Sequence, residues 1–134
     1  MWRCIEMPLA VLAFIAISAC LQPSSGQQAT EREAIHELQA LAIKSSQPGP
    51  QMNVDAQASS IFATGQQAAS YDKLMASMDF KKAINDVNGR RVVLYIYEKP
   101  QPRWLGTLEL RFILETDSQD RIEGVQGRIF LHTL

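Results

Sequence analysis

The sequence predicts an α+β fold, in which amino-terminal helices pack on a three-stranded, or four-stranded, antiparallel β-meander. Between residues 30 and 78, apolar residues recur at steps of three and four, which is the period of a helix face. From residue 90 onward they form β-branched runs or alternate with polar residues, and short connections separate these runs. Short connections favour antiparallel neighbours. One face of such a sheet needs a cover, which a helix at residues 71–78 can provide.

The first 19 residues have the pattern of a secretory signal peptide. Arg3 precedes about ten apolar residues, 8–17, which match a secretory core and are too few for the ~18–20 that span a bilayer. Ser18 and Ala19 are small, and Cys20 follows them directly. This arrangement resembles the lipobox of bacterial lipoproteins. The resemblance implies cleavage between Ala19 and Cys20, a diacylglycerol on the Cys20 thiol and an acyl chain such as palmitate on the new amino group.

An ordinary signal peptide cut near Ala19, or an uncleaved anchor, is the alternative, and Cys20 would then carry no lipid. Under the lipoprotein interpretation the attachment is permanent, because each buried CH₂ of three acyl chains contributes about 0.8 kcal/mol. Leu21 stands where many Gram-negative lipoproteins of the inner membrane carry Asp. The resemblance therefore implies the periplasmic face of the outer membrane, or the cell surface if the host has a single membrane.

Composition excludes several classes of partner. The chain has 13 Lys and Arg against 14 Asp and Glu, and this balance argues against a nucleic-acid partner, which needs a basic face. Cys4 leaves with the leader, so a mature chain that starts at Cys20 has no disulfide. Neither His36 nor His132 has a second ligand at metal spacing. We therefore expect no metal and no cofactor, and treat both histidines as surface residues.

Residues 20–29 are rich in Ser, Gln, Gly and Pro, and are expected to form a flexible tether. Residues 30–46 are expected to form an amphipathic helix that opens on Thr30 and Glu33 as a capping box. Its apolar stripe consists of Ala34, Ile35, Leu38, Leu41 and Ala42. Two prolines around a glycine end this helix. The remainder, residues 47–134, is then one small α+β domain.

A second helical region is expected at residues 53–78, where Gly65 separates a short first segment from the main helix. The stripe of the main helix consists of Tyr71, Leu74, Met75 and Met78. For residues 79–89 the sequence does not decide between a helix and a strand. Their apolar residues fit a helical period, whereas Asn88 and Gly89 are the strongest two-residue signal for a hairpin.

Three strands are expected after residue 90. Residues 92–97 are apolar on both faces, as in a strand that is covered on both sides, and a loop with two prolines follows at 98–103. Residues 104–115 alternate cleanly. Leu108, Leu110, Phe112 and Leu114 share one face, and Thr107, Glu109, Arg111 and Glu115 share the other. In the third strand, residues 122–131, Gly124 and Gly127 suggest a bulge or an edge.

Little in the sequence points to catalysis. Ser70 and Lys73 match the Ser-x-x-Lys pattern of serine acyl-transfer enzymes, but two specified residues in four occur by chance. The companion Lys-Thr-Gly is missing, and no pair of carboxylates is forced onto one site. We expect that the protein is not an enzyme and that Ser70 caps a helix.

A binding surface is the better candidate. Tyr95, Tyr97, Arg103 and Trp104 are of the residue types that dominate interface hot spots. The alternative for each of them is an ordinary place in the core or at its rim. A partner surface on this sheet is expected in either case, because a sheet with apolar residues on both faces is rarely left bare.

A lipobox, a tether, a helical segment and a terminal meander together resemble the SmpA/OmlA family of small outer-membrane lipoproteins. The resemblance rests on residues 61–65, 70–78 and 91–131, and it covers about half of the chain. It implies the helix–helix–three-strand fold shared with β-lactamase inhibitory proteins, and a non-catalytic role in assembling or stabilising the outer membrane. Residues 78–80 (Met-Asp-Phe) replace the family's Leu-Gly-x-Pro, so no binding residue is carried over.

The expected function is therefore that of a membrane-anchored envelope module that binds another envelope protein. An inhibitor or immunity-type lipoprotein, which would block an envelope enzyme or toxin through its sheet, is the first alternative. A serine hydrolase that uses Ser70 and Lys73 is the remote one.

Overall fold

A computed structural model describes residues 25–44, 51–101 and 106–133. The chain divides into two units, Met1–Thr30 and Glu31–Leu134. In chain order the elements are α2 (Ser25–Lys44), β1 (Met52–Asn53), α3 (Asp55–Ile61), the 3-10 helix η1 (Ala68–Tyr71), α4 (Asp72–Ser77), β2 (Lys81–Val87), β3 (Arg90–Gln101), β4 (Gly106–Thr116) and β5 (Ile122–Thr133).

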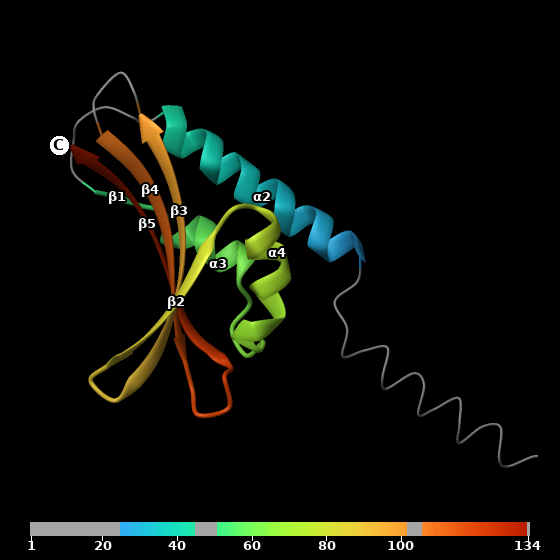
Figure 1. The fold of residues 1–134 in the computed structure, drawn as a ribbon. Coiled ribbons are helices and arrows are strands. Elements are labelled where there is room, and N and C mark those ends of the chain that lie inside the picture. Colours follow the sequence, from blue (N-terminus) through green and yellow to red (C-terminus); the bar gives the residue numbers. More distant parts are fainter. Residues whose placement is uncertain (1–24, 45–50, 102–105, 134) are drawn as a thin grey trace, which may run out of the picture. The chain divides into compact units, whose positions relative to one another are not determined.

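The strands form one antiparallel sheet in the order β1-β5-β4-β3-β2. Strands β2 to β5 are a meander, and the short β1 adds to β5 opposite Arg128 and Ile129. The predicted α+β class is thus confirmed, but the sheet has five strands rather than three or four. Figure 1 shows α3, α4 and the part of α2 from Glu31 onward on one side of the sheet.

The segment that the sequence left open, residues 79–89, contains the edge strand β2 and a tight turn. Asn88 and Gly89 have φ angles of 53° and 79°, and the strands on either side of them pair without a gap. Positive φ at both positions is the requirement of a type I′ hairpin turn. The turn chemistry therefore outweighs the helical spacing of the apolar residues, and of these Ile84 and Val87 remain about half exposed on the strand.

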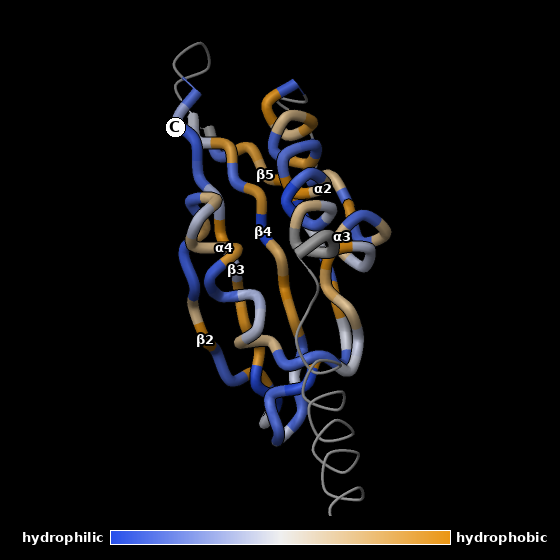
Figure 2. The backbone as a smooth tube through the Cα atoms, turned by 90° about the vertical axis from the view of Figure 1, so that its right-hand side faces the viewer, coloured by the Kyte–Doolittle hydropathy of each residue, from blue (hydrophilic) through white to orange (hydrophobic). Residues whose placement is uncertain are grey.

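The core lies between the sheet and the helices. The predicted alternation in β4 is confirmed, since Leu108, Leu110, Phe112 and Leu114 are all buried. The predicted stripe of Tyr71, Leu74, Met75 and Met78 is buried against them. Phe62 joins the two layers, because its ring lies within 6 Å of the rings of Tyr71, Tyr95 and Phe112. Figure 2 shows the hydrophobic positions along the strands and along α2.

The first helix starts earlier than predicted. It begins at Ser25, so residues 25–29 are helical rather than part of a tether, and Thr30 lies inside the helix instead of capping it. Residues 27–29 (Gln-Gln-Ala) have good helix propensity, which accounts for the extension. The predicted stripe is confirmed in part: Ile35, Leu38 and Ala42 are buried, whereas Leu41 is 38% exposed. The rest of the proposed tether, residues 20–24, lies outside the described residues.

Strand β3, the first of the three predicted strands, is longer than predicted. β3 continues to Gln101, so residues 98–101 are not a loop, and Pro100 pairs with Thr107 of β4. Beyond Ile96 no described strand lies on the other side of β3. The missing N–H of Pro100 is tolerated at such an edge.

Both glycines predicted to mark a bulge or an edge have a structural role. The register of β4 and β5 shifts between Glu115 and Thr116, opposite Gly124, which confirms a bulge there. Gly127 instead lies where α3 approaches β5. A Cβ at this position would be 2.8 Å from Val54 Cγ2 and 2.9 Å from the Val54 carbonyl oxygen.

In the part of the chain that the structure describes, no helix is long and apolar enough to cross a bilayer.

Candidate functional site

The face of the sheet opposite the helices, called the outer face below, carries apolar side chains on three adjacent strands. Strand register places them together, because Leu94 pairs with Ile113 of β4 and Val92 pairs with Asn85 of β2. The apolar members are Val87, Val92, Leu94, Ile96 and Ile113. Val87 is about half exposed, Val92 is buried, and the other three are partly buried. No described helix lies on this side (Figure 1).

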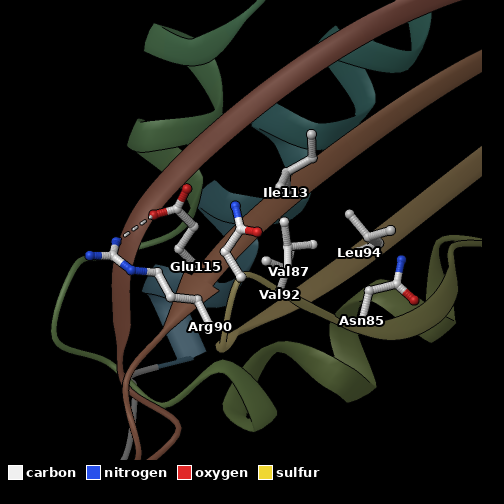
Figure 3. A pocket seen from close by; sticks show the side chains of 8 residues that line it. Asn85, Val87, Arg90, Val92, Leu94, Ile113 and Glu115 are labelled. Atoms are coloured by element: carbon white, nitrogen blue, oxygen red, sulfur yellow. Dashed lines mark ion pairs between the residues drawn. The ribbon is translucent and has the colours of Figure 1, made fainter.

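Part of the outer face is hollowed. A hollow of about 440 Å³ is lined by Asn85, Val87, Asn88, Arg90, Val92, Leu94, Ile113 and Glu115. Figure 3 shows Val87, Val92 and Leu94 gathered below Ile113, with Arg90 and Glu115 at one side. Arg90 Nη1 lies 3.5 Å from Glu115 Oε2 and forms an exposed ion pair with it. The hollow therefore has an apolar floor and a polar rim.

A second group on the outer face combines charged and aromatic side chains. Glu109 has a buried side chain, whose Oε1 lies 2.5 Å from Arg111 Nη2 and whose Oε2 lies 2.8 Å from His132 Nε2. The Arg111 guanidinium lies 5.0 Å from the centre of the Phe130 ring, and that ring stacks on the His132 imidazole. We call Glu109, Arg111, Phe130 and His132 the Glu109 cluster. His132, predicted to be a surface residue, is exposed but paired.

Of the residues predicted to form a partner surface, Tyr95 lies in the core. It is 1% exposed, and its hydroxyl donates to Asp72 Oδ1 at 2.6 Å, with the Ala68 carbonyl oxygen 3.2 Å away. Burial raises the pKa of Tyr95 far above its usual range, and the bond to Asp72 raises it further. Tyr95 therefore offers no surface to a partner in this fold.

Tyr97 is half buried on the helix side, where its ring lies 5.6 Å from the ring of Phe80. It also lines a hollow of about 410 Å³ beside α2, together with His36 and Arg32. Arg103 and Trp104 lie outside the described residues, as do Ala19 and Cys20. Of the predicted surface residues, the two that the structure describes, Tyr95 and Tyr97, both lie on the helix side of the sheet and not on the outer face.

The comparisons with known proteins decide nothing further. No family model, curated protein or solved structure matches this chain. What the site can do has to be derived from its own residues.

Ser70 and Lys73, the residues of the remote hydrolase alternative, lie in the adjoining short helices η1 and α4. The Ser70 hydroxyl donates a 2.6 Å hydrogen bond to the carbonyl oxygen of Gln67, the N-cap residue of η1. Ser70 therefore lies inside η1, and the prediction that it caps a helix is wrong. Among the described residues no hydrogen bond joins Ser70 to Lys73, and neither lines the two hollows above. The described part of the chain also contains no group of three His, Cys, Asp or Glu that could hold a metal ion.

Sequence reasoning missed the outer-face residues, although two signals for them were present. Residues 92–97 are apolar on both faces of the strand. The face of β3 turned away from the helices therefore had to be exposed or covered by a partner. In β4, Ile113 interrupts a polar face between Arg111 and Glu115. Only the register between the strands shows that these positions adjoin.

Proposed function

We propose that this chain is a lipid-anchored envelope protein that binds another envelope protein through the outer face of its sheet, without catalysis. The hollow lined by Val87, Val92, Leu94 and Ile113 is the observation that carries this proposal. The parts of these side chains that are still exposed lose water when a partner covers them, which contributes about 25 cal/mol per Å² of buried apolar area.

The composition of the outer face suits a protein partner. The cores of protein interfaces are apolar, and arginine and aromatic residues are enriched in them. The hollow supplies an apolar pocket for a protruding side chain, with Arg90, Glu115 and two asparagines at its rim. Next to it on the same face, the Glu109 cluster supplies Arg111 and Phe130.

The anchor in the proposal rests on the lipobox resemblance of residues 18–20. A lipid on Cys20 would keep the domain at the periplasmic face of the outer membrane, or outside the cell in a host with one membrane. Binding of a membrane-bound partner is then favoured, since both proteins are confined to one surface and their effective concentration is raised.

A comparison of two lysine variants tests the proposed surface. The lipidated full chain is recovered in mild detergent as wild type, as Ile113→Lys and as Met52→Lys, and bound envelope proteins are quantified. Met52 is an apolar residue that is 38% exposed and does not line the hollow, so its variant controls for an added charge.

We expect wild type and Met52→Lys to retain the same partner and Ile113→Lys to lose it at least tenfold. Equal retention by all three chains would overturn the outer face as the binding site. The recovered protein also separates the alternatives: an outer-membrane assembly protein supports the proposed role, whereas one soluble enzyme or toxin supports an inhibitor.

A further inference from the structure

The edge strand β2 offers a backbone that is unpaired on one side. It is hydrogen-bonded to β3 on its inner side, and no described strand lies on its outer side. The strand is seven residues long, and its central Ile84 is 48% exposed. At the opposite edge, β1 pairs with only two residues of β5, and Ile122 and Gly127 of β5 bond backbone groups of Gly65, Gln66 and Val54. Long edges with exposed apolar residues pair readily with another strand.

The turn determines which residues of β2 point their backbone groups outward. Val87 and Arg90 flank a two-residue turn, and such a flanking pair exchanges both N–H···O bonds. Bonded and non-bonded pairs alternate along an antiparallel ladder. The N–H and C=O groups that point away from β3 are therefore those of Lys82, Ile84 and Asp86.

We propose that two copies of this chain join through antiparallel pairing of their β2 strands, with Ile84 opposite Ile84 of the second copy. This register overlaps all seven residues of β2. It also places Lys82 opposite Asp86 of the second copy, and Asp86 opposite Lys82 of the second copy. A two-fold interface is self-complementary in this way, and cross-strand pairs of opposite charge stabilise it.

Charge selects this register over its neighbours. If the second strand shifts by two residues, Ile84 lies opposite either Lys82 or Asp86 of the other copy, and no opposite charges meet. If it shifts by four residues, Lys82 lies opposite Lys82 of the other copy, or Asp86 opposite Asp86, and the like charges repel. Asp86 is exposed, and the structure gives it no ion pair among the described residues. Lys82 already bonds Asp72 Oδ2 at 2.9 Å, but its ammonium group has further donors for a second carboxylate.

The pairing has a consequence for the outer face. A two-fold axis perpendicular to the sheet keeps the outer faces of both copies on the same side. The hollows of the two copies would then lie on one continuous sheet, on either side of the paired β2 strands. This inference stands on the edge strand alone and does not depend on the proposed partner or on the anchor.

Disulfide trapping tests the register in the full chain, in membranes. Residues that form a hydrogen-bonded pair have Cα atoms about 5.5 Å apart, which suits a disulfide. On oxidation, Ile84→Cys should give at least tenfold more reducible dimer than either Ala83→Cys or the parent chain gives. The parent chain is the control for any reaction of Cys20. Ala83→Cys mixed with Asn85→Cys should cross-link, because these residues face each other in the proposed register. Equal dimer from Ile84→Cys and Ala83→Cys overturns the register.

Charge complementation tests the pairing without added cysteines. The proposed register contains two symmetric pairs of residues 82 and 86. In Asp86→Lys both pairs become lysine opposite lysine, and in Lys82→Asp both become aspartate opposite aspartate. Each variant alone should dissociate at least tenfold more readily than wild type in sedimentation experiments, whereas an equimolar mixture should restore the dimer. Glu98→Lys, which carries the same charge change outside β2, should leave dimerisation unchanged. A monomeric wild type, or a mixture that stays monomeric, contradicts the proposal.

Discussion

The backbone N–H of Gly127 donates a 2.9 Å hydrogen bond to the carboxylate of Asp55, 72 residues earlier in the chain. The Arg128 guanidinium bonds the same carboxylate oxygen. These contacts hold the first turn of α3 against β5. Together with the close approach of Val54 to Gly127, they fix one end of the helical layer to the sheet.

Gly127→Ala should destabilise the protein by about 1–3 kcal/mol, the usual cost of forcing an extra carbon into a packed core. The new Cβ would meet the Val54 carbonyl oxygen at 2.9 Å, and backbone cannot move aside cheaply. Urea unfolding followed by circular dichroism measures the difference. Gly124→Ala is the control, because its Cβ would meet only the flexible Glu115 side chain at 3.4 Å. A loss as large in Gly124→Ala as in Gly127→Ala would contradict this packing.

Asp55 should make stability depend on pH in the acid range. The hydrogen bond from Gly127, with those from Arg128 and Asn53, lowers the pKa of Asp55 below its usual 3.8. A carboxyl group whose pKa is lower in the folded state contributes stability that is complete above its unfolded pKa. That contribution is lost as the pH falls from about 4 through the folded pKa. Asp117, whose pKa is lowered by the N–H groups of Arg121 and Gln119, acts in the same direction.

The free energy of unfolding, measured from pH 6 to pH 2, should therefore fall less steeply in Asp55→Asn than in wild type. Part of the acid loss should remain in the variant because Asp117 is unchanged. Parallel curves for the two proteins would show that Asp55 is not held by these bonds.

Leu110→Asp should unfold the domain, whereas Ile113→Asp should leave it folded. Leu110 is fully buried on the helix side of β4, and an unpaired charge there costs more than about 4 kcal/mol. Ile113 faces outward on the same strand, where water can reach the new carboxylate. Near-ultraviolet circular dichroism and the melting temperature separate the two cases. If both variants melt alike, the assignment of the two faces is wrong.

Cys20→Ala should abolish lipid attachment, because the thiol is the proposed lipid acceptor. The variant should stay uncleaved or appear in the soluble fraction, and it should take up no radiolabelled palmitate. Ser18→Ala keeps small residues before Cys20 and is the matched control, with labelling as in wild type. Cleavage, palmitate labelling and membrane fractionation of Cys20→Ala that all match wild type would contradict the lipoprotein proposal.

Local patterns were sufficient for much of the fold. The alternation of β4 separates buried from outward positions correctly because one face of that strand is polar. The Tyr71–Met78 stripe marks a buried helix surface for the same reason. In residues 79–89 two local signals conflicted, since the apolar spacing favours a helix and Asn88-Gly89 favours a hairpin. The sheet resolved this conflict, because β2 gains a full ladder of hydrogen bonds with β3.

The candidate site was less accessible to sequence reasoning. Residues 92–97 are apolar at nearly every position, so the sequence does not reveal which parity faces the helices. Pairing of Tyr95 with Phe112 turns Tyr95 inward, and pairing of Leu94 with Ile113 builds the hollow outside. Both depend on contacts between strands. Composition indicated that the sheet would carry a partner surface, but it could not identify the residues.

Photo-crosslinking in intact membranes tests the central claim most directly. A photoreactive amino acid is placed at Leu94 in the hollow, or at Met52 as the control, and the lipidated full chain is irradiated. We predict that position 94 cross-links to one envelope protein and that Ile113→Lys abolishes this product, while position 52 gives none. Cross-linking that is the same at both positions, or that survives Ile113→Lys, would contradict binding through the outer face.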